Sequence, residues 1–283
     1  MLKYKNFQLQ ILDWKINTVV AGNGPLLLFL HGIGNSWQWW QPTLSALADD
    51  FSVCAIDLPG SGSSSPLTSR PYPELYKALV ARLIELLDLG PAIVIGHSLG
   101  GYVTAQAAIQ KAPGIKAIAL VAPAGFGPVH NLIFKLLSIP IVGEFLVQFH
   151  QVGIPILLHS LVYDPHSVSE DMLRWAKKSS ESLAERKQFL YQLRVGVQCG
   201  HTTKRFLIKH APPLSIPISL LWGKHDSVFP IDIAYRTQQV LHAQPPVIFK
   251  SSGHFPFLEE PDQFNSALRS FALGVLSNEE PIH

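Results

Sequence analysis

Ser98 lies where a buried-strand pattern gives way to a helix pattern, which is a position suited to a nucleophile. Residues 91–95 form a short apolar run, and residues 102–112 have the composition of a helix. Gly96 and Gly100 permit a turn sharp enough to hold the serine in a strained conformation with its hydroxyl exposed. The N–H groups that open the helix would then face an oxyanion formed at this hydroxyl, with the positive end of the helix dipole behind them.

A serine hydroxyl is a weak nucleophile near neutral pH, so it needs a base and a third group that orients the base. Asp226 follows the apolar segment 216–222, and His254 follows the segment 246–249. All three residues therefore lie at the carboxyl ends of predicted strands, where open α/β sheets bind their ligands. Singly, Asp226 is typical of a turn and His254 of a loop. In the order Ser, Asp, His they predict a catalytic triad.

The loop at 31–34, His-Gly-Ile-Gly, follows the apolar segment 26–30 and predicts the second half of an oxyanion-binding site. We expect the backbone N–H groups of Ile33 and Leu99 to bind the same oxygen. The alternative, a tight turn and no more, stays open. We interpret His31 and His97 as packing or orienting residues.

Two further acids compete with Asp226 for the triad. Asp57 precedes Leu-Pro-Gly-Ser-Gly-Ser, which is turn chemistry, and Glu259 comes just before the last predicted helix. We therefore interpret Asp57 as part of a structural turn and Glu259 as the opening of that helix.

Strand and helix patterns alternate through two parts of the chain. Strands are predicted at 26–30, 51–57, 91–95, 115–121, 216–222 and 246–253, and helices at 74–89 and about 261–276. This alternation predicts a parallel sheet covered on both faces. Between these two parts, from Phe126 to about Phe206, apolar stretches with helical spacing are broken at Pro140, Pro155 and Pro165. We expect an α/β core formed by residues 1–125 and 206–283, with a helical cap inserted at 126–205.

The composition narrows the classes of ligand. Charged residues make up 15% and hydrophobic residues 47%, against about 25% charged in a typical protein, which indicates an apolar cavity or surface besides the core. The net charge of +2 and the absence of a dense basic stripe argue against nucleic-acid binding. The densest basic groups, Lys177-Lys178 and Arg186-Lys187, are expected on a solvated helix face.

Membrane and redox signals are weak. The N-terminal residues have no continuous apolar run typical of a signal peptide. Residues 145–163 lack formal charge but contain polar residues and Pro155, so we expect no transmembrane segment. A cap that lines an apolar pocket is preferred, and a cap in peripheral contact with a lipid surface stays open. Cys54 and Cys199 form no disulfide framework or metal-ligand spacing, so we expect a cytoplasmic protein without a metal site.

Aromatic residues near the proposed nucleophile are candidates for the substrate pocket, with ordinary packing as the alternative. The candidates are Trp37, Trp39, Phe126, Phe145 and Phe255, joined by the cap residues Leu132, Ile133, Leu136, Leu137, Leu146 and Phe149. They predict a small-molecule substrate with a small-to-medium apolar acyl group; that this substrate is an ester is what the resemblance described next implies.

Several motifs together resemble the α/β-hydrolase superfamily. They are His31-Gly32-x-Gly34, Asp57-x-Pro59-Gly60-x-Gly62-x-Ser64, Gly96-His97-Ser98-Leu99-Gly100-Gly101, Asp226 and Gly253-His254. The resemblance covers the chain outside the cap. It implies an α/β-hydrolase fold, with a mostly parallel eight-stranded sheet flanked by helices, a helical lid after the sixth strand, and no cofactor. A serine at the nucleophile position excludes the dehalogenase and epoxide-hydrolase branches, which use aspartate there, and favours a carboxylesterase or lipase.

Two other functions stay open on this fold. Relatives that hydrolyse a carbon–carbon bond in 2-hydroxy-6-oxo-dienoate ring-cleavage products often have Trp after the catalytic histidine and Asn before the serine. This chain has Phe255 and His97 there, which favours an esterase. Those relatives often also have a cap arginine that binds the substrate carboxylate, for which Arg174 and Arg194 are candidates. A non-catalytic ligand receptor is the third alternative.

Overall fold

The fold is built on one mixed sheet. The computed structural model describes residues 2–67, 73–198, 201–204 and 207–277. Its main sheet comprises β1 (Lys5–Ile11), β2 (Trp14–Ala21), β3 (Leu26–Leu30), β4 (Ser52–Ile56), β5 (Ala92–His97), β6 (Ile115–Val121), β9 (Ile218–Gly223) and β10 (Val247–Phe249), in the order β1-β2-β4-β3-β5-β6-β9-β10. The β1–β2 and β2–β4 pairs are antiparallel and the others parallel. The predicted eight-stranded, mostly parallel sheet is confirmed.

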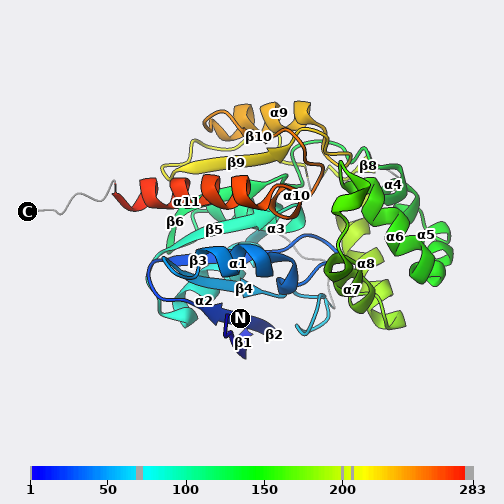
Figure 1. Cartoon of the computed structure of the whole chain (residues 1–283), viewed down its shortest axis with the longest axis horizontal. Helices are drawn as coiled ribbons and strands as arrows, with labels where there is room; N and C mark the ends of the chain where they lie inside the picture. The colour runs from blue at the N-terminus through cyan, green and yellow to red at the C-terminus, as the bar shows by residue number, and fades with distance from the viewer. Residues whose placement is uncertain (1, 68–72, 199–200, 205–206, 278–283) are drawn as a thin grey trace, which may run out of the picture.

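Helices cover both faces of this sheet. On one face α1 (Gln41–Leu47) packs against α11 (Pro261–Ser277), and on the other α2 (Pro73–Leu87) packs against α3 (Leu99–Ile109), as Figure 1 shows. Every residue of β3, β4 and β5 is buried, as expected of strands covered on both sides. The predicted helix at 74–89 ends earlier, at Leu87, because Asp88 and Gly90 have positive φ angles of 50° and 84°. The remaining core helices are α9 (Ile231–Leu241), α10 (Pro256–Glu259) and the 3₁₀ turn η1 (Trp37–Trp40).

The segment between β6 and β9 is mostly helical and stands beyond one end of the sheet (Figure 1). It contains α4 (Leu132–Ser138), α5 (Val142–Leu146), η2 (Val147–Phe149), α6 (His150–Leu161), η3 (Pro165–Ser167), α7 (Glu170–Lys178) and α8 (Leu183–Gly196). A small ladder of β7 (Val197–Gln198) and β8 (His201–Thr202) follows. The sequence did not predict this ladder, because two-residue strands leave no periodic pattern. The expected boundary at 205/206 lies outside the described residues.

The helices of this segment are short. Within the ranges that the structure describes, no single helix is long and apolar enough to cross a membrane. Among the described helices, only α4 taken together with Val142–Leu161 has the length and apolar composition of a membrane span. These two parts are bent by 112° relative to each other. Cys54 is a buried free thiol in β4, and Cys199 lies outside the described residues.

Glycines set how closely α3 approaches the sheet. A Cβ atom on Gly100 would lie 2.2 Å from the carbonyl oxygen of Leu30, and one on Gly96 would lie 2.3 Å from that of Gly100. Both neighbours are backbone atoms in buried elements, so neither can move aside at low cost. These glycines therefore fix the start of α3 against β3 and β5.

This packing predicts opposite effects for two Gly→Ala substitutions. Gly100→Ala should lower the free energy of unfolding by about 3 kcal/mol, because the new methyl group overlaps the Leu30 carbonyl. Gly274→Ala, in α11 with no atom within 4 Å of the added Cβ, should raise it by up to about 1 kcal/mol through helix propensity. Urea denaturation of both variants tests this. Equal effects would contradict the proposed close contact.

Candidate active site

The backbone at Ser98 is strained and firmly held. Ser98 directly precedes α3 and has φ 51° and ψ −112°, a conformation that costs a non-glycine residue about 1–3 kcal/mol. Its N–H donates to the carbonyl oxygen of Val121 at 2.9 Å, and its own carbonyl accepts from Ala124 at 2.9 Å and Tyr102 at 3.0 Å. Bonds to β6, the following loop and α3 thus hold the turn, and Ser98 lines a cavity of about 470 Å³.

His254 and Asp226 form a buried pair beside the same cavity. The Nδ1–H group of His254 donates to Oδ2 of Asp226 at 2.8 Å. The other carboxylate oxygen, Oδ1, accepts from the N–H groups of Val228 at 2.8 Å and Phe229 at 3.0 Å. His254 lines the cavity together with Ser98, whereas Asp226 lies behind it. With Nδ1 engaged, Nε2 is the nitrogen available to exchange a proton with a group in the cavity.

His97 supports the backbone of His254. Its Nε2–H donates to the carbonyl oxygen of His254 at 2.9 Å. Burial, followed by the proximity of His254, lowers the pKa of His97 well below the usual value. A neutral His97 is therefore expected, which fits its interpretation as an orienting residue.

The loop after β3 is fixed by a neutral histidine. The Nδ1–H group of His31 donates to the carbonyl oxygen of Gly32 at 2.7 Å, and Nε2 accepts from the N–H of Leu58 at 2.9 Å. This pattern needs the neutral ring, and burial lowers the pKa of His31, outweighing the opposite effect of Asp57. Ile33, in this loop, lines the cavity. Leu99 is the first residue of α3, so its N–H has no acceptor within the helix.

Asp57 ties this loop to its neighbours. Its carboxylate accepts from the N–H of Trp37 at 2.8 Å, from Nδ2 of Asn17 at 2.9 Å and from the N–H of Ser63 at 2.9 Å. The side chain is buried, and charge-assisted bonds of this kind are stronger than neutral ones. Asp57 therefore fixes both its own turn and the start of η1.

Glu259 organises the loop of His254, a function that the sequence did not predict. Its carboxylate accepts from the N–H groups of Gly253 at 3.0 Å and Phe255 at 3.1 Å, on either side of His254. It also accepts from the N–H of Tyr163 at 2.7 Å, just beyond α6. An acid five residues after the histidine was a signal in the sequence, but sequence does not reveal which backbone donors need acceptors.

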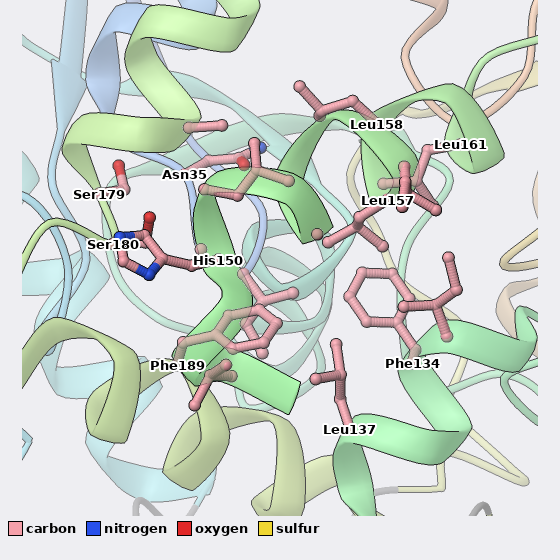
Figure 2. A pocket seen from close by; sticks show the side chains of 18 of the residues that line it. Asn35, Phe134, Leu137, His150, Leu157, Leu158, Leu161, Ser179, Ser180 and Phe189 are labelled. Carbon is pink, nitrogen blue, oxygen red and sulfur yellow. The ribbon is translucent and has the colours of Figure 1, made fainter. Parts of the chain in front are cut away.

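The cavity has a volume of about 470 Å³ and mostly apolar walls (Figure 2). The predicted pocket residues divide into two groups. Trp39 and Phe255 line the cavity, as do Ile133, Leu136, Leu137, Leu146 and Phe149. Trp37, Phe126, Phe145 and Leu132 do not line it.

Each aromatic residue outside the cavity packs elsewhere. Trp37 meets Tyr4 edge to face, with ring centroids 5.2 Å apart, and Phe126 is fully buried in the core. Phe145 is 59% exposed and contacts Phe149 edge to face, with ring centroids 5.2 Å apart. Of the basic residues expected on a solvated face, Lys177, Lys178 and Lys187 are exposed, whereas Arg186 is half-buried and lines the cavity.

Comparisons with known proteins agree with this architecture. The model of the Alpha/beta hydrolase family matches residues 27–267. A pimeloyl-[acyl-carrier protein] methyl ester esterase of Vibrio vulnificus is 29% identical over 266 residues, covering 89% of this chain and 95% of the relative. Among solved structures, a putative aryl esterase from Burkholderia cenocepacia is similar with a TM-score of 0.78 and 20% identity, covering 96% of this chain and all of that one.

A second solved structure is similar to the same extent. It is a 2-hydroxy-6-oxo-6-phenylhexa-2,4-dienoate hydrolase from Rhodococcus, with a TM-score of 0.79 and 21% identity, covering 96% of this chain and 99% of that chain. At 20% and 21% identity, the similarity between this chain and these two structures shows a common fold and nothing about activity.

The environment of Glu259 predicts a pH-dependent stability. Burial raises the pKa of Glu259 from its usual value of 4.5, although bonds from Gly253, Tyr163 and Phe255 act in the opposite direction. A carboxyl group with a raised folded-state pKa stabilises the fold most below the unfolded-state pKa, and this contribution is lost as pH rises through the folded-state pKa. The free energy of unfolding of the wild type, minus that of Glu259→Gln, should therefore fall as pH rises from about 4 to 7. A difference that grows over this range, measured by urea denaturation, would contradict the assignment.

Proposed function

The chain belongs to the alpha/beta hydrolase family, and from this premise we propose that it is a serine hydrolase of carboxylic esters. The observation that best supports the proposal is the buried His254–Asp226 pair, whose histidine lines the same cavity as the strained Ser98. We assign Ser98 as the nucleophile, His254 as the general base and acid, and Asp226 as the group that orients the histidine. The relative from Vibrio vulnificus is named as a methyl ester esterase, an activity that agrees with this proposal.

In the proposed first half-reaction, Oγ of Ser98 attacks the ester carbonyl while Nε2 of His254 takes its proton. The negative charge of the tetrahedral intermediate is held by the N–H groups of Ile33 and Leu99, each contributing about 3 kcal/mol of transition-state stabilisation. Asp226 stabilises the imidazolium that forms. When the intermediate collapses, the C–O bond of the ester breaks, and His254 returns the proton to the leaving alcohol.

In the second half-reaction, water replaces the alcohol. His254 removes a proton from the water as its oxygen attacks the acyl-enzyme carbonyl. When the second tetrahedral intermediate collapses, the C–O bond to Ser98 breaks, His254 returns the proton to Oγ of Ser98, and the carboxylic acid leaves. Of the groups that this reaction uses, Ser98, His254 and Ile33 line the cavity.

We propose that α4–α8 act as a cap over this cavity and that its apolar walls select small-to-medium apolar acyl groups. Trp39, Phe255 and leucines of α4 and α6 provide the apolar contacts, and a cavity of about 470 Å³ is large enough for such a group. Contact of these helices with lipid and a cytoplasmic location stay predictions.

Carbon–carbon hydrolysis is the second candidate, favoured by the similarity to the Rhodococcus dienoate hydrolase. The two arginines suggested for carboxylate binding are engaged elsewhere, however. Arg174 pairs with Asp171, and Arg194 pairs with Glu144. Neither arginine lines the cavity. These ion pairs remove Arg174 and Arg194 as candidates for carboxylate binding, whereas Arg186 does line the cavity.

The proposed mechanism predicts the effect of removing the nucleophile. Ser98→Ala should lower kcat for p-nitrophenyl esters at least about 10³-fold, because the acyl-enzyme can no longer form. Ser277→Ala, at the end of α11, is the matched control and should retain wild-type kcat. Activity that persists in Ser98→Ala would contradict the assignment of the nucleophile.

The acyl-chain profile of the wild type separates the candidate functions. We expect turnover of p-nitrophenyl esters between C2 and C12 to peak at C4–C8, because the apolar walls reward added methylene groups until the cavity is full. Equal turnover of acetyl and C6–C8 esters would contradict the proposed pocket. Faster turnover of a 2-hydroxy-6-oxo-dienoate would indicate the carbon–carbon hydrolase. Binding of ligand without turnover of any ester would indicate a receptor.

A further inference from the structure

Large apolar side chains gather on the outer side of α4, α5, η2 and α6. Half of the large apolar residues that are exposed in the described part of the chain belong to this one stretch, and the others are scattered over the rest of the molecule. We call this group the outer face; it consists of Leu132, Leu136, Ile141, Val142, Phe145, Leu146, Phe149, Val152 and Ile156. Single exposed apolar residues are normal on a protein surface, whereas a dense group of them indicates an interaction surface.

The elements that carry the outer face lie against one another. α5 contacts both α4 and η2, and η2 contacts α6. The rings of Phe145 in α5 and Phe149 in η2 meet edge to face, with centroids 5.2 Å apart. In Figure 1, α5 and α6 form the edge of the molecule that points away from the sheet. The apolar side chains are therefore placed where a large flat partner can reach them.

The helix α6 is apolar on two sides. Ile154 and Leu158, four residues apart, are buried on the side where α6 contacts α7. Val152 and Ile156, also four apart, are exposed to 65% and 56%. A helix that is apolar around its circumference is normally covered all round, either by protein or by lipid. The composition of α6 thus indicates that its exposed side also has a cover.

The outer face carries almost no net charge, which narrows the nature of this cover. The only formally charged residues between positions 131 and 163 are Lys135 and Glu144. Glu144 is paired with Arg194, whose Nη2 donates to Oε2 of Glu144 at 2.8 Å. Lys135 is half-buried, and a lysine stem can lie along apolar groups while its ammonium reaches water. Because unpaired charges are costly in an apolar medium, a face without them is complementary to hydrocarbon.

The cavity of Ser98 opens within the outer face. Phe149, Val152 and Ile156 are each more than half exposed, and each also lines the cavity, so they lie at its mouth. A second protein chain on this face would cover the mouth and keep substrate out. A lipid surface would instead bring the mouth against acyl chains, so that an apolar substrate could enter without crossing water. The position of the mouth therefore favours lipid over protein.

From these observations we propose that the outer face docks on the surface of a neutral lipid bilayer, with the cavity mouth turned toward the acyl chains. α4 and Val142–Leu161 together have the length and apolar composition of a membrane segment, but they are bent by 112°. With 12 residues, α6 is also too short to cross a hydrocarbon layer of about 30 Å. The helices therefore lie in the interface rather than span the bilayer. The docking goes beyond the proposed ester hydrolysis and requires no catalytic step.

Sedimentation with phosphatidylcholine vesicles tests the docking. The wild type should bind the vesicles, and a double variant, Ile141→Glu with Phe145→Glu, should have a partition coefficient at least about tenfold lower, because two carboxylates then meet the apolar layer. The N–H of Phe145 donates to the carbonyl oxygen of Ile141 at 2.9 Å, as expected for neighbours on one helix face. Neither residue lines the cavity. The matched control, Leu273→Glu, changes an exposed leucine of α11 and should bind like the wild type.

A milder variant guards against misfolding. Phe145→Gln adds no charge and should lower the partition coefficient about threefold, because one apolar side chain less is buried. The midpoint of urea denaturation should stay at the wild-type value in this variant, which shows that the fold is intact. A folded Phe145→Gln and a double variant that both bind vesicles as tightly as the wild type would overturn the proposal.

Salt dependence and oligomeric state distinguish the other possible covers. Raising NaCl from about 0.1 M to about 0.5 M should change vesicle binding less than about twofold, because apolar contacts are not screened by salt. Binding that salt abolishes, or that occurs only with anionic lipid, would overturn the proposal. A wild-type dimer in analytical ultracentrifugation that the double variant dissociates, without vesicle binding, would also overturn it, since a second copy would then cover the outer face.

Two comparisons separate the docking from the proposed function. Ser98→Ala should bind vesicles like the wild type, because the nucleophile is not part of the outer face. If the wild type binds vesicles and the double variant does not, while no ester is hydrolysed, the docking stands and ester hydrolysis is wrong. If both proteins hydrolyse p-nitrophenyl butyrate at equal rates and bind vesicles equally, ester hydrolysis stands and the docking is wrong.

Discussion

The positive φ angle at Ser98 is the constraint on which the remaining features of the site depend. An alanine or larger side chain at Gly96 or Gly100 would overlap backbone atoms, so the turn from β5 to α3 exists only with glycine at both places. The turn brings the start of α3 against β3 and leaves the Leu99 N–H without an acceptor in the helix. The same compact geometry therefore places Ser98, which is buried, at the wall of the cavity.

Two carboxylates, the buried Asp57 and the half-buried Glu259, hold the loops that surround this turn. Asp57 accepts three N–H donors and fixes the loop after β4 to the start of η1. Glu259 accepts from the residues on both sides of His254 and from Tyr163 beyond α6, while the N–H of His254 donates to the carbonyl oxygen of Leu161 at 2.7 Å. The histidine is therefore bonded to the helices over the cavity as well as to Asp226. Movement of α6 would therefore also move the backbone of His254, the proposed base.

Much of the architecture was predictable, because buried parallel strands leave continuous apolar runs in the sequence. The segments at 26–30 and 115–121 coincide with β3 and β6. The strand-end positions of Ser98, Asp226 and His254 could be found because turn residues follow each run. The walls of the cavity could not be predicted fully. Apolar character does not reveal direction, so Phe126 and Phe145 were grouped with Phe255 although one is in the core and one on the surface.

Polar contacts were harder still to predict. Arg186 belongs to a helix rich in charged residues, and only the three-dimensional arrangement shows that it lines the cavity without an acidic partner.

The central claim is that Ser98 is a nucleophile activated by His254. Intact-protein mass spectrometry after treatment with an alkyl fluorophosphonate tests it most directly. The account predicts a single adduct on Ser98, no adduct in Ser98→Ala, and at least about 10²-fold slower labelling in His254→Ala. An unlabelled wild type, or an adduct that persists without Ser98, would contradict it.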